Sequence, residues 1–377
     1  NDMHLTIRAP SIWYKLRLKL ADDSLDITGV SLPGAPAIVV GSNGFVAWGF
    51  TNTNIDTSDI IELRINPDDA NEYLTPNGYR QFDVIEEIIH ASDGSKEVFF
   101  VNETIWGPVI EKSDGNYYAY RWVAHMTDGA NWSLLNMENM KSVDEALSHA
   151  SDMGIPAQNA LIVDVGGNIA WSIFGKLPRR PDGDYGQVMD WSDGKFEWNE
   201  WYTSAEYPKI INPKNNRLWT ANNRVVSGDD LLKVGINRYD LGARAKQIKD
   251  RLMALSAPVQ EKDLYDIMFD NEAVFLSRWQ QQLVSVLIAS DDDAFGSYLK
   301  EVKNWGGYAD KQSVGYRLVK EYRNQVFETL MGHLTAACMV YDKRCNYDSA
   351  TRQWEAPLWE LVTSEPDGWL PDDISSW

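Results

Sequence analysis

The chain is poor in basic residues, in cysteine and in long apolar runs. Its 377 residues include 35 lysines and arginines against 55 aspartates and glutamates, which gives a formal net charge of −20. This excess of negative charge argues against nucleic acid or an anionic membrane as a partner. No run of about 18 apolar residues occurs, so we expect no transmembrane helix, and no signal peptide is recognisable. The chain begins without methionine, and we therefore expect a processed product or part of a longer protein.

The two cysteines, Cys338 and Cys345, allow two interpretations. Six residues lie between them, a spacing that excludes the C-x-x-C arrangement of redox and zinc motifs. They are close enough to form a small disulfide loop in an oxidising compartment, and they fit equally well as two buried thiols. Cysteine alone leaves this choice open, although the acidic composition suits a protein that stays dispersed outside the cytoplasm.

Aromatic residues are abundant, with 16 tryptophans and 17 tyrosines. They indicate either large aromatic packing or a pocket for apolar or sugar-like ligands. A carbohydrate-binding module or glycosidase is therefore one alternative, because aromatic rings stack on sugars and paired carboxylates cleave glycosidic bonds. No carboxylate pair on matched strand ends supports it.

Hydrophobic periodicity divides the chain into a sheet-rich part and a helical part. Period-two patterns predict strands over 14–20, 26–32, 45–51, 60–65, 117–124, 160–165 and 169–174, with a hairpin over 83–91 and 96–101. Helical patterns cover 131–139, 142–151, 242–255, 260–270, 277–289, 293–302 and 314–333. We therefore expect a sheet-rich core over 1–240, a mainly helical segment over 241–346, and a tail over 347–377 that leads to a C-terminal part outside the chain.

The stretch 41–59 carries the first candidate site. A glycine-rich turn precedes the predicted strand 45–51, and Asp56 and Asp59 follow in what we expect to be a polar loop. Small residues at a strand end let backbone N–H groups point outward, where they can bind a developing oxyanion. Two nearby aspartates offer hard oxygen ligands of the kind that Ca²⁺ prefers. Taken alone, such a stretch is more often an ordinary sheet corner.

A second pair of motifs follows after residue 217. The letters LWTANNR occupy 218–224, and GARA occupies 242–245. The side-chain amide of Asn222 can donate a hydrogen bond without titrating, and Arg244 stays charged at any working pH. An Asn-Asn pair by itself more often marks a turn.

These motifs together resemble the penicillin acylase family of N-terminal-nucleophile hydrolases, which includes cephalosporin and acyl-homoserine-lactone acylases. The resemblance rests on GSNGFVAWGFTNT at 41–53, on the first fourteen residues, on 156–180 and on the two motifs above. It covers nearly the whole chain, although Ser42 and Trp106 stand where the family usually has histidine. It implies an α+β fold, the four-layer α-β-β-α sandwich of these hydrolases in partial form, with a helical insertion after residue 245.

The resemblance also implies the roles of four residues in catalysis. His4 would position the nucleophile, and the backbone N–H of Asn52 would bind the oxyanion together with the side chain of Asn222. Arg244 would support Asn222. Histidine at position 4 tilts the expected substrate towards the homoserine-lactone and cephalosporin types.

A calcium ion is the cofactor that the resemblance implies. Asp56, Asp59 and the backbone of Ser58 would hold it between two chains. Weaker candidates for further ligands are Gly186, Asp229 and Asp230.

The nucleophile itself is expected outside this chain. The family uses a serine, rarely threonine or cysteine, exposed at a chain terminus by autocatalytic cleavage, with its α-amino group as the base. That residue would lie shortly upstream of Asn1, whose carboxamide cannot replace it. We therefore expect this chain to be inactive by itself and to need a small chain of the same precursor. In the intact protein it would hydrolyse a small acyl amide of the penicillin, cephalosporin or acyl-homoserine-lactone type. The alternative is a family member that has lost catalysis and kept only the scaffold. The expected location is periplasmic or secreted.

Overall fold

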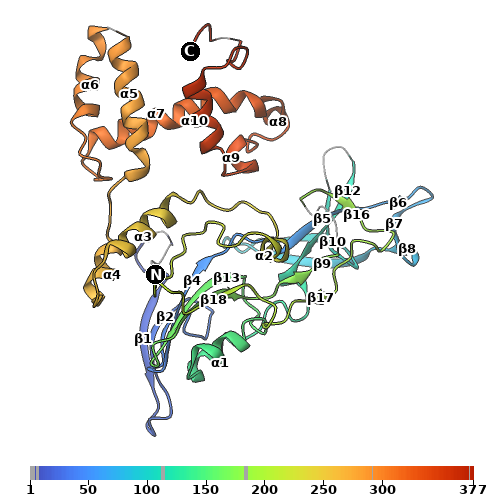
Figure 1. Cartoon of the computed structure of the whole chain (residues 1–377). Coiled ribbons are helices and arrows are strands. Elements are labelled where there is room, and N and C mark those ends of the chain that lie inside the picture. The colour runs from blue at the N-terminus through green and yellow to red at the C-terminus, as the bar shows by residue number, and fades with distance from the viewer. Residues whose placement is uncertain (1–4, 6–7, 112–114, 182–185, 291, 373) are drawn as a thin grey trace. The chain divides into compact units, whose positions relative to one another are not determined.

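The chain forms two units that differ in secondary structure. The computed structural model describes residues 5, 8–111, 115–181, 186–290, 292–372 and 374–377. The units are Asn1–Asn237 and Arg238–Trp377, coloured blue to yellow and yellow to red in Figure 1. The first unit holds the strands and two short α-helices, and the second unit is helical. Helices and mainly antiparallel sheets thus occur in one chain, which confirms the predicted α+β class.

A seven-stranded antiparallel sheet forms the part of the first unit that carries the predicted active-site motifs. In spatial order its strands are β1 (Tyr14–Lys19), β2 (Asp26–Ser31), β3 (Val40–Ser42), β4 (Val46–Asn52), β13 (Gln158–Asp164), β14 (Ile169–Phe174) and β18 (Lys209–Ile211). Strand β4 lies beside β13, with Asn52 opposite Gln158. The end of β4 therefore lies at the beginning of β13, although the two strands are distant in sequence.

Helix α1 (Val143–Ser148) contacts β13 and β14 of this sheet. Its N-terminus is capped as the sequence predicts, because the hydroxyl of Ser142 accepts a hydrogen bond from the N–H of Glu145 at 3.2 Å. The carboxylate of Glu145 accepts from the N–H of Lys141. The reciprocal arm of the predicted capping box thus goes one residue further back than expected.

A six-stranded sheet forms the other large part of the first unit. Its spatial order is β16 (Met189–Asp190), β5 (Ser58–Glu62), β12 (Tyr117–Trp122), β11 (Gly107–Glu111), β10 (Lys96–Thr104) and β9 (Asp83–His90). The hairpin predicted over 83–91 and 96–101 is confirmed as β9 and β10. Tyr73, Trp106, Trp191 and Trp198 pack against this sheet as a buried aromatic core. These tryptophans serve packing, so they offer no stacking surface for a sugar.

Smaller elements complete the first unit. They are the three-stranded sheet of β6 (Ile65–Asn66), β7 (Asp69–Thr75) and β8 (Gly78–Gln81), the pair β15 (Pro178–Arg179) and β17 (Glu200–Trp201), helix α2 (Asp229–Val234), and 3-10 helices at Val123–His125 and Ser133–Asn139.

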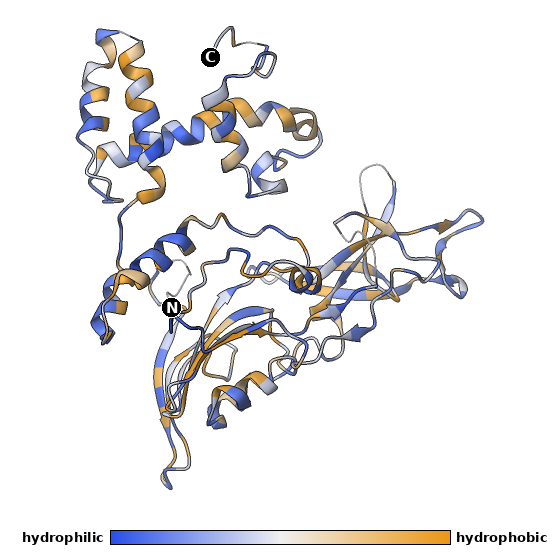
Figure 2. Ribbon diagram, viewed as in Figure 1, coloured by the Kyte–Doolittle hydropathy of each residue, from blue (hydrophilic) through white to orange (hydrophobic). Residues whose placement is uncertain are grey.

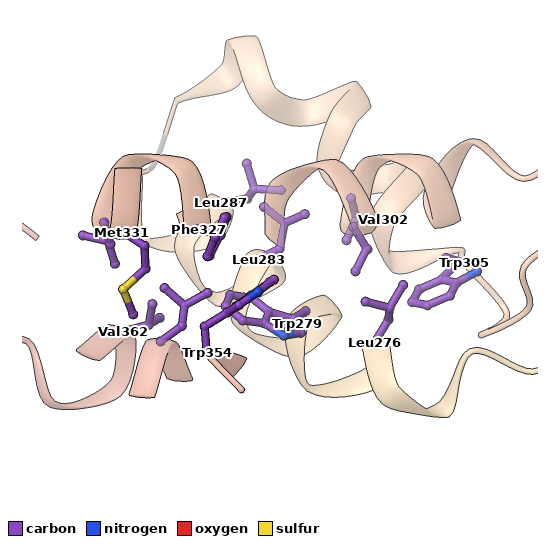
Figure 3. Packing of buried hydrophobic residues seen from close by; sticks show 13 residues of the cluster. Leu276, Trp279, Leu283, Leu287, Val302, Trp305, Phe327, Met331, Trp354 and Val362 are labelled. Atoms are coloured by element: carbon purple, nitrogen blue, oxygen red, sulfur yellow. The ribbon is translucent and has the colours of Figure 1, made fainter. Parts of the chain in front are cut away.

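The second unit is built from amphipathic helices, whose hydrophilic and hydrophobic faces are visible in Figure 2. They are α3 (Ala243–Ala254), α4 (Glu261–Met268), α5 (Ser277–Ala289), α6 (Gly296–Lys303), α7 (Val314–Met331), α8 (Ala336–Tyr341), α9 (Tyr347–Ala350) and α10 (Glu355–Ser364), with 3-10 helices at Val274–Leu276, Asp293–Phe295 and Gly332–Thr335. Figure 3 shows how Trp279, Leu283, Phe327 and Trp354 converge in its hydrophobic core. The rings of Phe327 and Trp354 lie 4.0 Å apart between centroids.

One charged cluster is buried beside this core. The carboxylate of Glu355 forms ion pairs with Arg278 at 2.5 Å and with Arg323 at 2.7 Å. It also accepts a hydrogen bond from the indole N–H of Trp279 at 2.7 Å. The buried charge is thus compensated from three directions, which is the condition for its burial.

The two cysteines are joined. Cys338 and Cys345 form a disulfide with an S–S distance of 2.06 Å, which decides between the two interpretations that the sequence left open. Each helix among the described residues is too short or too polar to cross a membrane.

Several predicted boundaries need correction. The strand predicted over 60–65 begins earlier, at Ser58, and ends at Glu62, because Ser58 and Asp59 pair with Trp122 and Arg121 of β12. The helix predicted over 131–139 is a 3-10 helix over Ser133–Asn139. The bounds of β5 shift because pairing with a distant strand, and not local periodicity, sets where this strand begins.

Candidate active site

The end of strand β4 meets the segment that carries the predicted Asn-Asn motif. The hydroxyls of Thr51 and Thr220 lie 2.8 Å apart, and the side-chain amide of Asn222 donates to the carbonyl oxygen of Asn52 at 3.0 Å. Asn222 adopts a φ of 62°, a left-handed conformation that asparagine tolerates better than most residues. The structure thus brings together two predicted site residues that are 170 positions apart in sequence.

A third asparagine holds the same carbonyl group. Asn159, which is buried in β13, donates its side-chain amide to the carbonyl oxygen of Asn52 at 3.3 Å. Its own side-chain oxygen accepts from the indole N–H of Trp171 at 2.9 Å, which fixes the orientation of the amide. Two side-chain amides from distant segments thus hold the carbonyl group of Asn52, at the end of β4, in place. Amide N–H groups in fixed positions are the type of donor that binds an oxygen on which negative charge develops.

The other two predicted catalytic residues are His4 and Arg244. His4 lies outside the described residues. Arg244, at the beginning of α3 in the second unit, forms an ion pair with Asp240 at 2.8 Å, and Asp240 also pairs with Arg352. The predicted support of Asn222 by Arg244 stays a prediction.

The two aspartates of the predicted metal site share one arginine. The guanidinium of Arg180 lies 3.3 Å from a carboxylate oxygen of Asp56 and 3.3 Å from one of Asp59. It also donates to the backbone carbonyl of Asp56 at 3.0 Å. Side-chain exposure is 10% for Arg180, 12% for Asp56 and 3% for Asp59, so these charges are largely removed from water. Removing any one of these largely desolvated charges would leave another without its compensating partner.

Burial also changes the protonation of this cluster. It raises the pKa of Asp56 from 3.8 to about 6, although the positive charge of Arg180 opposes the shift and the negative charge of Asp59 adds to it. One oxygen of Asp59 accepts from the indole N–H of Trp198 at 2.6 Å. The other oxygen, Oδ1, is buried and has no hydrogen-bond partner among the described residues.

The end of helix α2 positions Asp56. The backbone N–H of Asp56 donates to the carbonyl of Val234 at 3.0 Å. Gly235, with a φ of +75°, approaches so closely that an added Cβ would lie 2.5 Å from the Cβ of Asp56. The prediction of a polar loop at Asp59 is wrong, since Asp59 and the neighbouring Ser58 lie in strand β5. Arg180 and Trp198 make a buried aspartate in that strand possible.

The cluster fits a hard cation in part. The unpartnered Oδ1 of Asp59 and the neighbouring carboxylate of Asp56 are oxygen donors of the type that Ca²⁺ binds, whereas the ion needs six to eight oxygens. In the part of the chain that the structure describes, no group of three or more His, Cys, Asp or Glu side chains could hold a metal. Further ligands would have to be backbone oxygens or come from elsewhere in the protein. Gly186 is exposed, and Asp230 pairs with Lys233 at 2.8 Å.

Sequence reasoning missed three residues of these clusters, namely Asn159, Arg180 and Trp198. Asn159 and Arg180 lie within the stretch 156–180 that carries part of the resemblance, but nothing in their local pattern distinguishes them from a strand start and a loop cation. Trp198 belongs to a loop whose sequence shows an abundance of aromatic residues but no sign of which of them contacts Asp59. The buried carboxylate of Asp59 requires such donors, but its burial is visible only in the structure.

Comparison with known proteins relates the chain to two kinds of acylase. It is 22% identical over 304 residues to the acyl-homoserine lactone acylase QuiP of Pseudomonas aeruginosa, which covers 74% of this chain and 34% of that protein. It is 28% identical over 264 residues to the penicillin acylase 2 proenzyme of Pseudomonas sp. strain SE83, covering 68% of this chain and 33% of that protein. The chain thus spans about a third of the length of these curated relatives.

The fold is that of a solved acylase. The structure is similar to thermostable penicillin G acylase from Alcaligenes faecalis, with a TM-score of 0.71 at 21% identity, over 88% of this chain and 61% of that one. This likeness confirms the predicted fold of the N-terminal-nucleophile hydrolases. The sequence profile described as Penicillin amidase matches residues 1–376. Since that match spans almost the entire chain, the chain belongs to the penicillin amidase family.

Proposed function

We propose that the protein of which these 377 residues are part hydrolyses the acyl amide bond of a small molecule. The observation that carries the proposal is the contact between Asn222 and Asn52 at the end of β4, in a chain of the penicillin amidase family. Relatives named as acyl-homoserine lactone acylases and penicillin acylases suggest these two substrate classes.

The proposed reaction proceeds through an acyl-enzyme. The hydroxyl or thiol of a residue upstream of Asn1 attacks the amide carbonyl, and its proton passes by way of its own α-amino group to the leaving amine. The carbon–nitrogen bond breaks, and the acyl group stays on the nucleophile as an ester or thioester. Water then attacks this carbonyl, releases the carboxylic acid and restores the nucleophile. His4 positions the nucleophile.

Asn52 and Asn222 would stabilise the two tetrahedral intermediates. The backbone N–H of Asn52 and the side-chain amide of Asn222 donate to the oxyanion, where fixed donors need no reorganisation as charge develops. Asn159 keeps the strand end in place through the carbonyl of Asn52. Arg244 supports Asn222 in this scheme.

Calcium and a second chain complete the proposal. Asp56, Asp59 and the backbone of Ser58 would hold Ca²⁺ together with oxygens from a small chain of the same precursor. When bound, the ion would neutralise the buried carboxylates and tie the chains together. The disulfide and the net charge of −20 support a periplasmic or secreted location.

The role of Asn222 is tested in the whole protein. For Asn222→Ala we expect kcat to fall by roughly 10²–10³-fold with little change in KM, since one oxyanion donor is lost. Asn71→Ala is the matched control, because Asn71 is an exposed asparagine bonded to Asp69 and far from this chemistry in sequence. Equal activity of both variants would contradict the assigned role.

The nucleophile and the substrate need separate measurements. The intact mass and N-terminal sequences of the whole gene product should reveal two chains, the larger of them beginning with Ser, Thr or Cys shortly before Asn1. Hydrolysis of acyl-homoserine lactones and penicillins with graded acyl chains then ranks the substrates. An uncut chain that cleaves none of these amides would leave the protein a non-catalytic scaffold.

A further inference from the structure

The hairpin of β9 and β10 is unusually apolar for a solvent-exposed element. Strand β9 is the last strand of the six-stranded sheet, and all its residues are exposed. Seven large apolar side chains of the hairpin are between 40% and 64% exposed: Val84, Ile85, Ile88, Ile89, Val98, Phe99 and Phe100. Single exposed apolar residues are normal, but a contiguous group of this size marks an interaction surface.

The apolar residues occupy both faces of the hairpin. Phe100 lies opposite Glu86 and Val98 opposite Ile88, on one face, whereas Phe99 lies opposite Glu87 on the other. Directly opposed residues share a face and successive residues alternate between faces, so neither face is a purely polar outer side. Strand β9 pairs along one edge with β10 and along the other with no strand of the described residues. An element with two apolar faces and such an edge needs cover from more than one direction.

The two faces differ in charge. The face of Phe99 also carries four acidic residues, since every second residue of β10 and the residue opposite it share this face: Glu87, Glu97, Glu103 and Asp83. The face of Phe100 carries a single glutamate along its length and ends at Lys96. An occupant of the Phe99 face should therefore present lysine or arginine beside its apolar groups.

A second copy of the hairpin is a poor occupant. A two-fold pairing of β9 along its full length would place Glu86 of each copy opposite Glu87 of the other, and like charges directly opposed are destabilising. A two-fold contact through one face would leave the other face exposed.

We propose that the β9–β10 hairpin is the docking surface for another segment of the same protein, one outside the 377 residues. This segment covers both faces, pairs with the free edge of β9, and places basic residues against the glutamates of the Phe99 face. The length of the relatives supports this occupant, since the chain spans about a third of them and the remainder is long enough to wrap an element.

Photo-cross-linking in the whole protein tests the proposal. A benzophenone amino acid replaces Phe99 in one variant and Phe100 in another, so that each face is probed without removing an aromatic ring. The same replacement at Val165, which is 72% exposed after β13, is the control. We expect both hairpin variants to cross-link, on irradiation, to peptides outside the 377 residues, and the Val165 variant to give none.

An equal mixture of ordinary and ¹⁵N-labelled protein identifies the source of each cross-linked peptide. Products that join two peptides of the same isotope only would support a segment of the same molecule. Mixed-isotope products would show a second copy, and products within the 377 residues would show that the chain covers its own hairpin. Either of these results, or the absence of cross-links from both faces, would overturn the proposal.

Discussion

Replacement of Arg180 by methionine should strongly destabilise the first unit. Arg180 is the cation between Asp56 and Asp59, with side-chain exposures of 10%, 12% and 3%. Methionine keeps much of the length of the arginine stem but removes the positive charge and its contacts with Asp56 and Asp59, including the one to the backbone carbonyl of Asp56. Two buried carboxylates then remain side by side without their cation.

The expected loss follows from this burial. Removing one partner of a buried ion pair costs about 3–5 kcal/mol, because an uncompensated charge is left behind. Protonation of Asp56 relieves part of this cost, since without Arg180 its pKa, already raised to about 6, rises further. The loss in Arg180→Met should therefore be larger at pH 8 than at pH 5.

Urea unfolding of the whole protein, followed by tryptophan fluorescence, measures the effect with chelator and with added calcium. Arg179→Met is the matched control, because Arg179 is the neighbouring residue and lies at the surface in an ion pair with Glu206. We expect a clearly smaller loss in this control. If calcium binds Asp56 and Asp59, it should restore stability to Arg180→Met more than to the control. Equal losses in the two variants, independent of pH, would refute the reasoning.

Three further predictions concern stability. Burial raises the pKa of Asp56 from 3.8 to about 6. The contribution of this side chain to the free energy of unfolding is therefore complete below pH 3.8 and is lost as the pH rises through about 6. The unfolding free energy of calcium-free protein should thus fall by about 3 kcal/mol over that interval, and Asp56→Asn should lack this decrease. Glu355→Gln should lower the free energy of unfolding of the second unit by about 3 kcal/mol, and hence its melting temperature, because Arg278 and Arg323 lose their shared counter-charge. Opening the disulfide, whose cysteines are 7 positions apart, by Cys338→Ser should cost roughly 2 kcal/mol, and reduction of the unchanged protein should have the same effect.

Each of these predictions has a contrary outcome. If the unfolding free energies of the unchanged protein and Asp56→Asn depended on pH in the same way, Asp56 would have the same pKa in the folded and the unfolded state. A melting temperature unchanged by Glu355→Gln would mean that the charge of Glu355 does not stabilise the second unit. Unequal effects of reduction and substitution at the disulfide would point to the serine itself as the cause.

The elements of this fold were largely predictable from local pattern. Strand β14 and helix α5 have the predicted bounds, and the hairpin of β9 and β10 follows its turn signal. In each of these the period of apolar residues and the turn residues act over a few neighbouring positions. The prediction failed where distant pairing decides, as at Asp59, which local composition assigns to a loop and β12 draws into a strand.

The candidate site divides in the same way. The motifs around Asn52 and Asn222 are visible in the letters, and their chemistry is a property of the residue types. Three features of the structure are not visible in the letters. They are the 3.0 Å hydrogen bond from the side chain of Asn222 to the carbonyl of Asn52, the second amide on that carbonyl, and the arginine between two aspartates. The sequence by itself thus determined the elements, the family resemblance and the candidate residues. Only the tertiary structure decided which of them meet, because strand order and register bring together residues far apart in the chain, and no local period specifies either.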